Sequence, residues 1–165
     1  MIRKKKMFAR PRKAYEKSRI EEENALVEKY GLKNKREIWK TLAKVNYFRG
    51  RAKALAKSSM EEQKVLFDKL KFIGLNTNTI SDVLALKVED LLERRLPTVM
   101  VKKKIANAPR QARQMVVHKR VMIEGKAINV PSYLVPVSQE HSITVRHSAR
   151  KKNKPEVKEA EVQNG

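Results

Sequence analysis

The stretch Glu93–Pro136 constrains the fold of this chain most, because its pattern changes from helical to strand-like within one short segment. Ala112 and Val116 recur at the spacing of one helical face, which predicts a short helix that begins near Pro109. Proline suits a first helical position, since its missing N–H would have no partner there. Gly125 lies between two apolar runs, which is typical of a hairpin turn. The stretch therefore predicts a small unit of helices followed by strands.

Two prolines mark further boundaries in this stretch. Pro97 would interrupt a continuous helix, so one helix is expected to end near Leu96 and another to begin at Pro97. Pro131 is expected to end the second hairpin strand, because proline has no N–H to donate to a neighbouring strand. Beyond Pro136, the run 143–145 offers one more short strand.

Basic side chains dominate the same stretch. Residues 94–130 hold ten lysines and arginines and a single acid, Glu124. Solvated surfaces usually interleave both signs, so this bias indicates a polyanionic partner. At the start of the helix, free N–H groups and the guanidinium groups of Arg110 and Arg113 would form an anion site. An ordinary solvated helix face is the alternative.

The whole chain has a net charge of +21, concentrated in two basic blocks at residues 1–57 and 94–130. The block between them, residues 58–93, is slightly acidic, and its acids could face a basic neighbouring protein or simply solvent. Within it, Ser81 is expected to cap a short helix. Residues 1–13 form a basic arm that is expected to become ordered only against RNA, and residues 150–165 a disordered charged tail.

Three longer helices are predicted before the basic stretch. Ser18, Asn34 and Ser59 are each followed three residues later by glutamate, which is the capping-box pattern of a helix start. The expected helices cover about 19–30, 35–57 and 60–73, with Gly31 and Gly74 at two of the ends. The core positions expected on them are Leu26, Val27, Tyr30, Ile38, Leu42, Val45, Ala52, Leu55, Val65, Leu66, Leu70 and Ile73.

Several of these segments resemble a known family. Glu-Arg-Arg-Leu from Glu93, Ala-Arg-Gln from Ala112, the His118 position, the Gly125 turn and Val-Pro-Ser-Tyr from Val130 resemble the RNA-binding module of the small-subunit ribosomal protein S-four family. Residues 11–23 and 30–39 resemble the amino-terminal signature of its archaeal and eukaryotic branch. The resemblance covers nearly the whole chain from about residue 10 to residue 145.

This sequence departs from the family pattern at two positions. Pro97 stands where the family usually has Gln or Asp, and Ala108 stands where serine commonly caps the second module helix. Loss of such a cap destabilises a helix by about 1 kcal/mol. Neither departure removes a basic residue.

The resemblance implies a fold class and a division of the chain. The expected class is α+β and mostly helical, with a helical amino-terminal domain before an S-four-type module of two helices and short strands. The expected domains are residues 1–93, a basic arm and helical ribosomal-RNA-binding domain, and residues 94–149, the RNA-binding module, followed by the tail at 150–165.

The resemblance also implies two groups of RNA-binding residues. In the module these are Arg94, Arg95, Lys104, Arg110, Arg113, Gln114, His118, Lys119, Arg120, Lys126 and Tyr133. In the amino-terminal part they are Arg10, Arg12, Lys13, Lys33, Asn34, Lys35 and Arg36. Tyr133 could stack on a base or, alternatively, pack inside the protein.

As a function, the resemblance implies a structural constituent of the small ribosomal subunit. Such a protein would bind small-subunit (16S-type) ribosomal RNA directly, act early in assembly of the subunit body and influence decoding accuracy. It would lie near the path of the incoming messenger RNA, with ribosomal protein S-five as a neighbour. The expected location is the cytoplasmic ribosome.

Other classes of protein are disfavoured by the sequence. The chain has no cysteine, which excludes disulfides and thiolate zinc sites. No run approaches the roughly 20 apolar residues of a membrane span, and no cleaved presequence is expected. A phosphate loop, a paired nucleophile and base, and a metal cluster were not found, so neither an enzyme nor a cofactor is expected. The alternatives left open are a separate RNA-modifying or RNA-repair factor and a nonspecific DNA-compacting protein.

Overall fold

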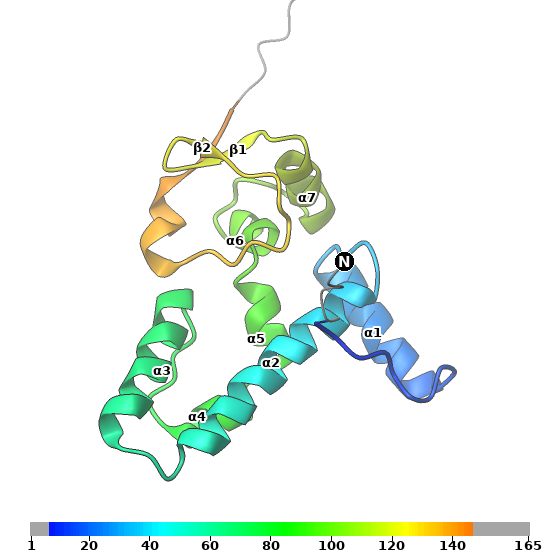
Figure 1. Cartoon of the computed structure of the whole chain (residues 1–165). Helices are drawn as coiled ribbons and strands as arrows, with labels where there is room; N and C mark the ends of the chain where they lie inside the picture. The colour runs from blue at the N-terminus through cyan, green and yellow to red at the C-terminus, as the bar shows by residue number, and fades with distance from the viewer. Residues whose placement is uncertain (1–6, 147–165) are drawn as a thin grey trace, which may run out of the picture.

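The computed structural model describes residues 7–146, so the predicted tail, the last three residues of the expected module and the first six residues of the arm lie outside the described part. The chain forms helices first and a small sheet last (Figure 1). The helices are α1 (Lys17–Lys29), α2 (Arg36–Leu55), α3 (Met60–Ile73), α4 (Ile80–Ala85), α5 (Val88–Glu93), α6 (Leu96–Lys102), α7 (Pro109–Val117) and the 3-10 helix η1 (Val137–Ser142). The strands are β1 (Val121–Ile123), β2 (Lys126–Ala127) and β3 (Ile143–Val145). The predicted α+β, mostly helical class is confirmed.

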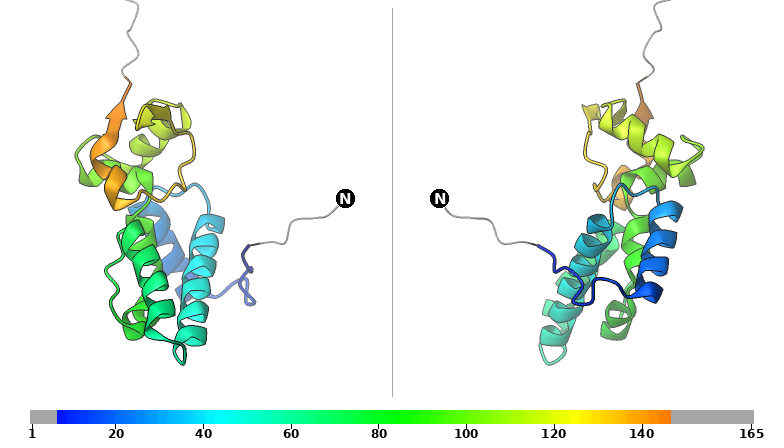
Figure 2. Two further views of the ribbon diagram at one scale, coloured as in Figure 1. Left: turned by 60° about the vertical axis from the view of Figure 1, so that its left-hand side comes forward. Right: turned by 90° about the vertical axis from the view of Figure 1, so that its right-hand side faces the viewer.

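Helix α2 is the axis of the amino-terminal part. Helices α3, α4 and α5 contact it, and α2 and α3 lie side by side in both views of Figure 2. Their apolar side chains form one buried cluster, which includes Val45, Phe48, Leu70 and Val83. A smaller cluster around Tyr30 joins the end of α1 to the start of α2 and to α5.

The second part of the molecule is a compact unit of α6, α7, η1 and the sheet. It has its own buried cluster, in which Met100 of α6 meets Val116 of α7 and Val121 of β1. This unit sits at one end of the helical part, above α5 in Figure 1. The segment after the hairpin returns to the α5–α6 link, where the Leu96 N–H donates to the Tyr133 carbonyl at 2.9 Å.

The three-stranded sheet has the order β2-β1-β3, and both pairings are antiparallel. Ile123 pairs with Lys126, so a two-residue turn connects β1 and β2. Both turn residues have positive φ, +51° at Glu124 and +78° at Gly125, as a hairpin with right-handed twist requires. The predicted hairpin and final strand are confirmed, although β2 ends three residues earlier than expected.

The three longer helices agree with the predicted ranges to within two residues at either end. Gly31 and Gly74 follow α1 and α3 with positive φ, as predicted. The expected capping boxes at Ser18, Asn34 and Ser59 are wrong, because none of these side chains caps a helix. The Glu37 carboxylate, three residues after Asn34, instead accepts hydrogen bonds from Arg95 and Arg113. Helix α4 is capped by Thr79, with Asp82 completing the box, so the expected cap at Ser81 is also wrong.

Two predicted core residues lie at the surface. Leu42 is 42% exposed and Val65 is 70% exposed, whereas Phe48 and Phe67 are buried in the core instead. The other predicted positions of α2 and α3 are buried or partly buried, among them Val45, Ala52, Leu66 and Leu70. The predicted buried faces of the two helices are therefore largely confirmed, and the two phenylalanines were missed.

Candidate nucleic-acid interface

Helix α7 presents the basic and polar face that its periodicity predicts. Pro109 occupies the first turn, Ala112 and Val116 are buried, and Arg110 and His118 are exposed on the opposite side. Ala108 makes no side-chain cap, in agreement with the sequence. The free N–H groups of this helix start and the Arg110 side chain therefore face solvent together.

More exposed cations surround this helix. We define the α7 face as Arg110, Gln114, His118, Lys119 and Arg120, which lie on the outer side of α7 or directly after it. Lys119 adopts φ of +56° directly after the helix and Arg120 precedes β1, so the chain turns sharply at a basic corner. All five residues of the α7 face are exposed candidates. Lys104, which precedes α7, and Lys126 of β2 are also exposed.

A second basic surface lies along the first half of α2. Arg36, Lys40 and Lys44 follow one another at four-residue spacing and are exposed. Like charges at this spacing destabilise an isolated helix by about 0.2–0.5 kcal/mol per pair, so the arrangement indicates an anionic partner. We call these three residues the α2 stripe. Lys40 and Lys44 were not predicted as site residues, although their spacing in the sequence was the signal that could have found them.

The α2 stripe lines a cleft of about 340 Å³ between the helical part and the carboxyl-terminal unit. The predicted residues Asn34 and Arg36 line it as well, together with Arg95, Arg113 and the segment around Ser132. The cleft is therefore bordered by five cations and a single carboxylate, that of Glu37. Such a lining attracts phosphate groups.

Two predicted arginines meet that carboxylate inside the protein. Arg95 is 5% exposed, and its Nη2 donates to Glu37 Oε2 at 2.6 Å. Arg113 of α7 donates from Nη1 and Nη2 to the same carboxylate, at 3.1 and 2.8 Å. Burial would raise the pKa of Glu37, but hydrogen bonds and positive charge from Arg113 and Arg95 outweigh it and lower that pKa. We call these three residues the Glu37 brace.

Arg94 is also turned into the protein. Its Nε donates to the Ile73 carbonyl at 2.6 Å, at the end of α3, and its Nη2 donates to the Val135 carbonyl at 2.8 Å. The same Nη2 is paired with Glu140 of η1. The expectation that Arg94, Arg95 and Arg113 stand free on the outside is therefore corrected: their guanidinium groups join the two parts of the chain.

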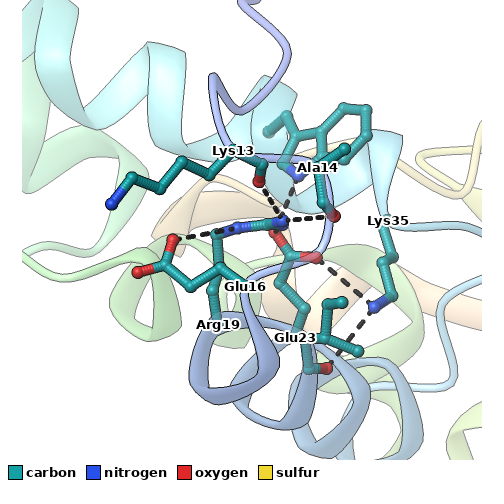
Figure 3. Close-up of polar contacts among 8 residues, drawn as sticks. Lys13, Ala14, Glu16, Arg19, Glu23 and Lys35 are labelled. Carbon is teal, nitrogen blue, oxygen red and sulfur yellow. Dashed lines mark hydrogen bonds and ion pairs between the residues drawn. The ribbon is translucent and has the colours of Figure 1, made fainter.

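The basic arm is held against α1 by Arg19, whose guanidinium is also paired with the buried Glu23 carboxylate. Arg19 donates to Glu23 at 2.8 Å and to the carbonyls of Lys13 and Ala14 at 2.8 and 3.0 Å (Figure 3). Lys35 reaches Glu23 from the start of α2, at 3.5 Å. Burial raises the pKa of Glu23, but hydrogen bonds from the Trp39 ring N–H and Arg19, with the charges of Arg19 and Lys35, lower it overall.

This contact changes the expectation for the arm and for Lys35. Residues 7–15 have a defined place in the isolated chain, which was expected only in the presence of RNA. Phe8 packs near Trp39, with ring centroids 6.2 Å apart. Arg10, Arg12 and Lys13 are exposed there, as are Lys33 and Asn34, whereas Lys35 is half-buried.

Tyr133 follows the packing alternative. Its hydroxyl donates to Gln139 Oε1 at 2.7 Å, and its ring lies against the core of the carboxyl-terminal unit. Among residues 7–146, no group of three or more His, Asp or Glu side chains is placed to hold a metal ion. None of the helices in that range combines the length and the apolar character that crossing a bilayer would require.

Comparison with known proteins agrees with this geometry. The S4 domain family matches residues 94–141, which contain α6, α7, the hairpin and most of η1. Small ribosomal subunit protein uS4 of Methanocella arvoryzae is 39% identical over 153 residues, covering 85% of this chain and 75% of the relative.

The uS4 proteins of two other archaea are similarly related. That of Methanococcus aeolicus is 40% identical, covering 84% of this chain and 82% of its own length. That of Picrophilus torridus is 36% identical, covering 88% and 84%. These relatives span both the helical part and the carboxyl-terminal unit, so the chain belongs to the family of small ribosomal subunit protein uS4.

Proposed function

We propose that this chain is a structural protein of the small ribosomal subunit and that it binds the 16S-type ribosomal RNA directly. The observation that carries this proposal is the set of exposed cations on the α7 face and the α2 stripe. In the described part of the chain, none of these cations takes part in an ion pair. Glu37, the one carboxylate that lines the cleft, is instead bound by Arg95 and Arg113.

Binding would rest on neutralisation of RNA phosphates. Each phosphate that a lysine or arginine neutralises releases a counterion, which makes the slope of log K against log salt more negative by about 0.7–0.9. Arg110, Lys119 and Arg120 would act from the α7 face. Arg36, Lys40 and Lys44 would act from the α2 stripe, and their cleft would admit a stretch of RNA backbone.

Selectivity would come from the fixed relation of the two surfaces. The Glu37 brace ties the first turn of α2 to α7 and to the start of α6. Gly31 approaches the start of α7 so closely that an added Cβ would lie 2.9 Å from the backbone of Pro109 and Arg110. A rigid pair of basic surfaces fits one shape of folded RNA and does not require a reading of base sequence.

The wider role is proposed on the family alone. It comprises early assembly of the subunit body, an effect on decoding accuracy, a place near the incoming messenger RNA in the cytoplasmic ribosome, and contact with ribosomal protein S-five. The division into domains at residues 1–93, 94–149 and 150–165 also stays a proposal. The relatives are ribosomal proteins and not RNA-modifying enzymes, which disfavours the alternative of a modification or repair factor.

The test is a competition experiment with the full chain. Folded small-subunit ribosomal RNA and a duplex DNA of equal length are offered at about 150 mM salt, where nonspecific binding is weak. We expect the RNA to bind about a hundredfold more tightly or better. Equal affinity for the two would reject the proposal in favour of a nonspecific nucleic-acid-compacting protein.

A further inference from the structure

The outer side of α7 contains a hollow whose chemistry differs from that of the cationic cleft. It has a volume of about 350 Å³ and is lined by Gln111, Gln114, Met115, His118 and Arg120. This volume is at the low end of the range of small-ligand pockets, about 300–1,000 Å³. A single charged side chain, Arg120, lines it, whereas five cations line the cleft beside α2.

The two glutamines give the hollow both donors and acceptors. The Oε1 of Gln111 accepts a hydrogen bond from the Asn107 N–H at 3.1 Å, which leaves its amide NH₂ to donate outward. Gln114 lies one turn further along and is exposed, and within residues 7–146 neither its carbonyl nor its NH₂ has a hydrogen-bond partner. A phosphate offers acceptors alone, whereas the edge of a nucleobase offers donors and acceptors together.

The remaining lining residues suit a flat ring. Met115 is half-buried against the core of the unit, so its thioether forms an apolar, polarisable floor. His118 has a planar ring, on which unstacked bases are commonly held in RNA complexes. It is exposed beside the hollow.

We propose that this hollow receives one unpaired nucleobase of the bound RNA and hydrogen-bonds its edge through Gln114 and Gln111. This inference rests on the proposed binding of ribosomal RNA and deepens it. The cationic cleft and the exposed lysines and arginines hold the backbone by charge, and the α7 hollow fixes the register by accepting one base that lies outside a helix.

The test compares Gln114→Leu, which removes the amide at nearly constant size, with Asn46→Leu, which removes an exposed amide from α2 away from the hollow. The full chain is titrated with folded small-subunit ribosomal RNA at several salt concentrations. We expect Gln114→Leu to weaken binding about tenfold with no change in the salt slope, because no phosphate contact is lost. Asn46→Leu should bind as the unsubstituted chain does, and circular dichroism should show equal helicity for all three proteins.

A second readout identifies the base itself. Base-reactive dimethyl sulfate and a carbodiimide together probe all four bases, and one unpaired nucleotide should be protected by the unsubstituted chain and reactive again with Gln114→Leu. An affinity within about twofold of the unsubstituted chain, a reduced salt slope, or an unchanged protection pattern would each overturn the inference. If the unsubstituted chain itself fails to bind the RNA, the proposed function is what fails.

Discussion

Substitution of Glu37 by glutamine should weaken both the fold and the interaction with RNA. The Glu37 carboxylate accepts three hydrogen bonds, one from the guanidinium group of Arg95 and two from that of Arg113. Glu37→Gln keeps the shape of the side chain and removes its charge. Arg95, which is 5% exposed, would then be left as a buried cation without its carboxylate.

The expected size of the effect follows from these contacts. Removing one partner of a fully buried ion pair destabilises a protein by about 3–5 kcal/mol. The side chains of Glu37 and Arg113 are 18% and 21% exposed, so water screens part of the interaction, and the glutamine oxygen can still accept one bond. We therefore expect a loss of about 2–3 kcal/mol, or a decrease in Tm of about 4–12 °C for a chain of this size.

Urea unfolding followed by circular dichroism measures this loss. Glu22→Gln serves as the matched control, because Glu22 is an exposed residue of α1 with no ion pair among the contacts of residues 7–146. It should change the unfolding free energy by less than about 0.5 kcal/mol. A Glu37→Gln variant as stable as this control would refute the reasoning that the brace joins the two parts.

RNA binding separates the brace from a simple charge effect. Glu37 borders the cationic cleft, so loss of its negative charge should by itself tighten RNA binding. If the brace aligns the α2 stripe with the α7 face, affinity should fall instead, at a temperature where the variant remains folded. Tighter binding by Glu37→Gln would mean that the alignment of the two surfaces is not needed.

Three further predictions concern phosphate contacts, acid stability and close packing. Double substitution Arg110→Ala, Arg120→Ala should make the salt dependence of RNA binding less steep, by about 1.4–1.8 in the slope of log K against log salt, while helicity stays the same. An unchanged slope would remove both residues from the interface. The folded state lowers the pKa values of Glu23 and Glu37, so both carboxylates stabilise it fully above their unfolded-state pKa of 4.5. This stability should be lost as pH falls through the lowered folded-state pKa values. Urea midpoints between pH 7 and 2 check this, and a stability that does not change over that range would contradict it. Gly31→Ala should destabilise the chain by about 2 kcal/mol in thermal unfolding, because φ is +59° there and a Cβ would lie 2.9 Å from neighbouring backbone. Gly50→Ala is the control and should not destabilise the chain, because an added Cβ would meet open space.

The local pattern of the sequence was enough to predict the helices and the hairpin. Pro97 and Pro109 mark helix starts through their missing N–H, and Gly125 marks the turn through its positive φ, so each feature depends on one residue's own backbone chemistry. The face of α7 was predictable for the same reason, because the spacing of Ala112 and Val116 fixes which side is buried.

The contacts made by the individual charges could not be predicted in this way. Glu37 looked like the last residue of a capping box, yet its carboxylate meets Arg113, which is 76 residues away in the sequence. Arg94 and Arg95 looked like free surface charges because their acceptors are also distant in the sequence. Arg94 binds η1 and the segment before it, and Arg95 binds Glu37 of α2. Ion pairs and hydrogen bonds between distant segments depend on how whole helices pack together, and the local sequence pattern does not predict that packing.

A density map of the small ribosomal subunit from cells that make this chain tests the main proposal most directly. We expect the chain to be present, with the α7 face and the α2 stripe against ribosomal RNA and with Arg94, Arg95 and Arg113 still bound to protein acceptors. A map in which the chain is absent, or in which Arg110, Lys119 and Arg120 face open solvent, would contradict the proposal.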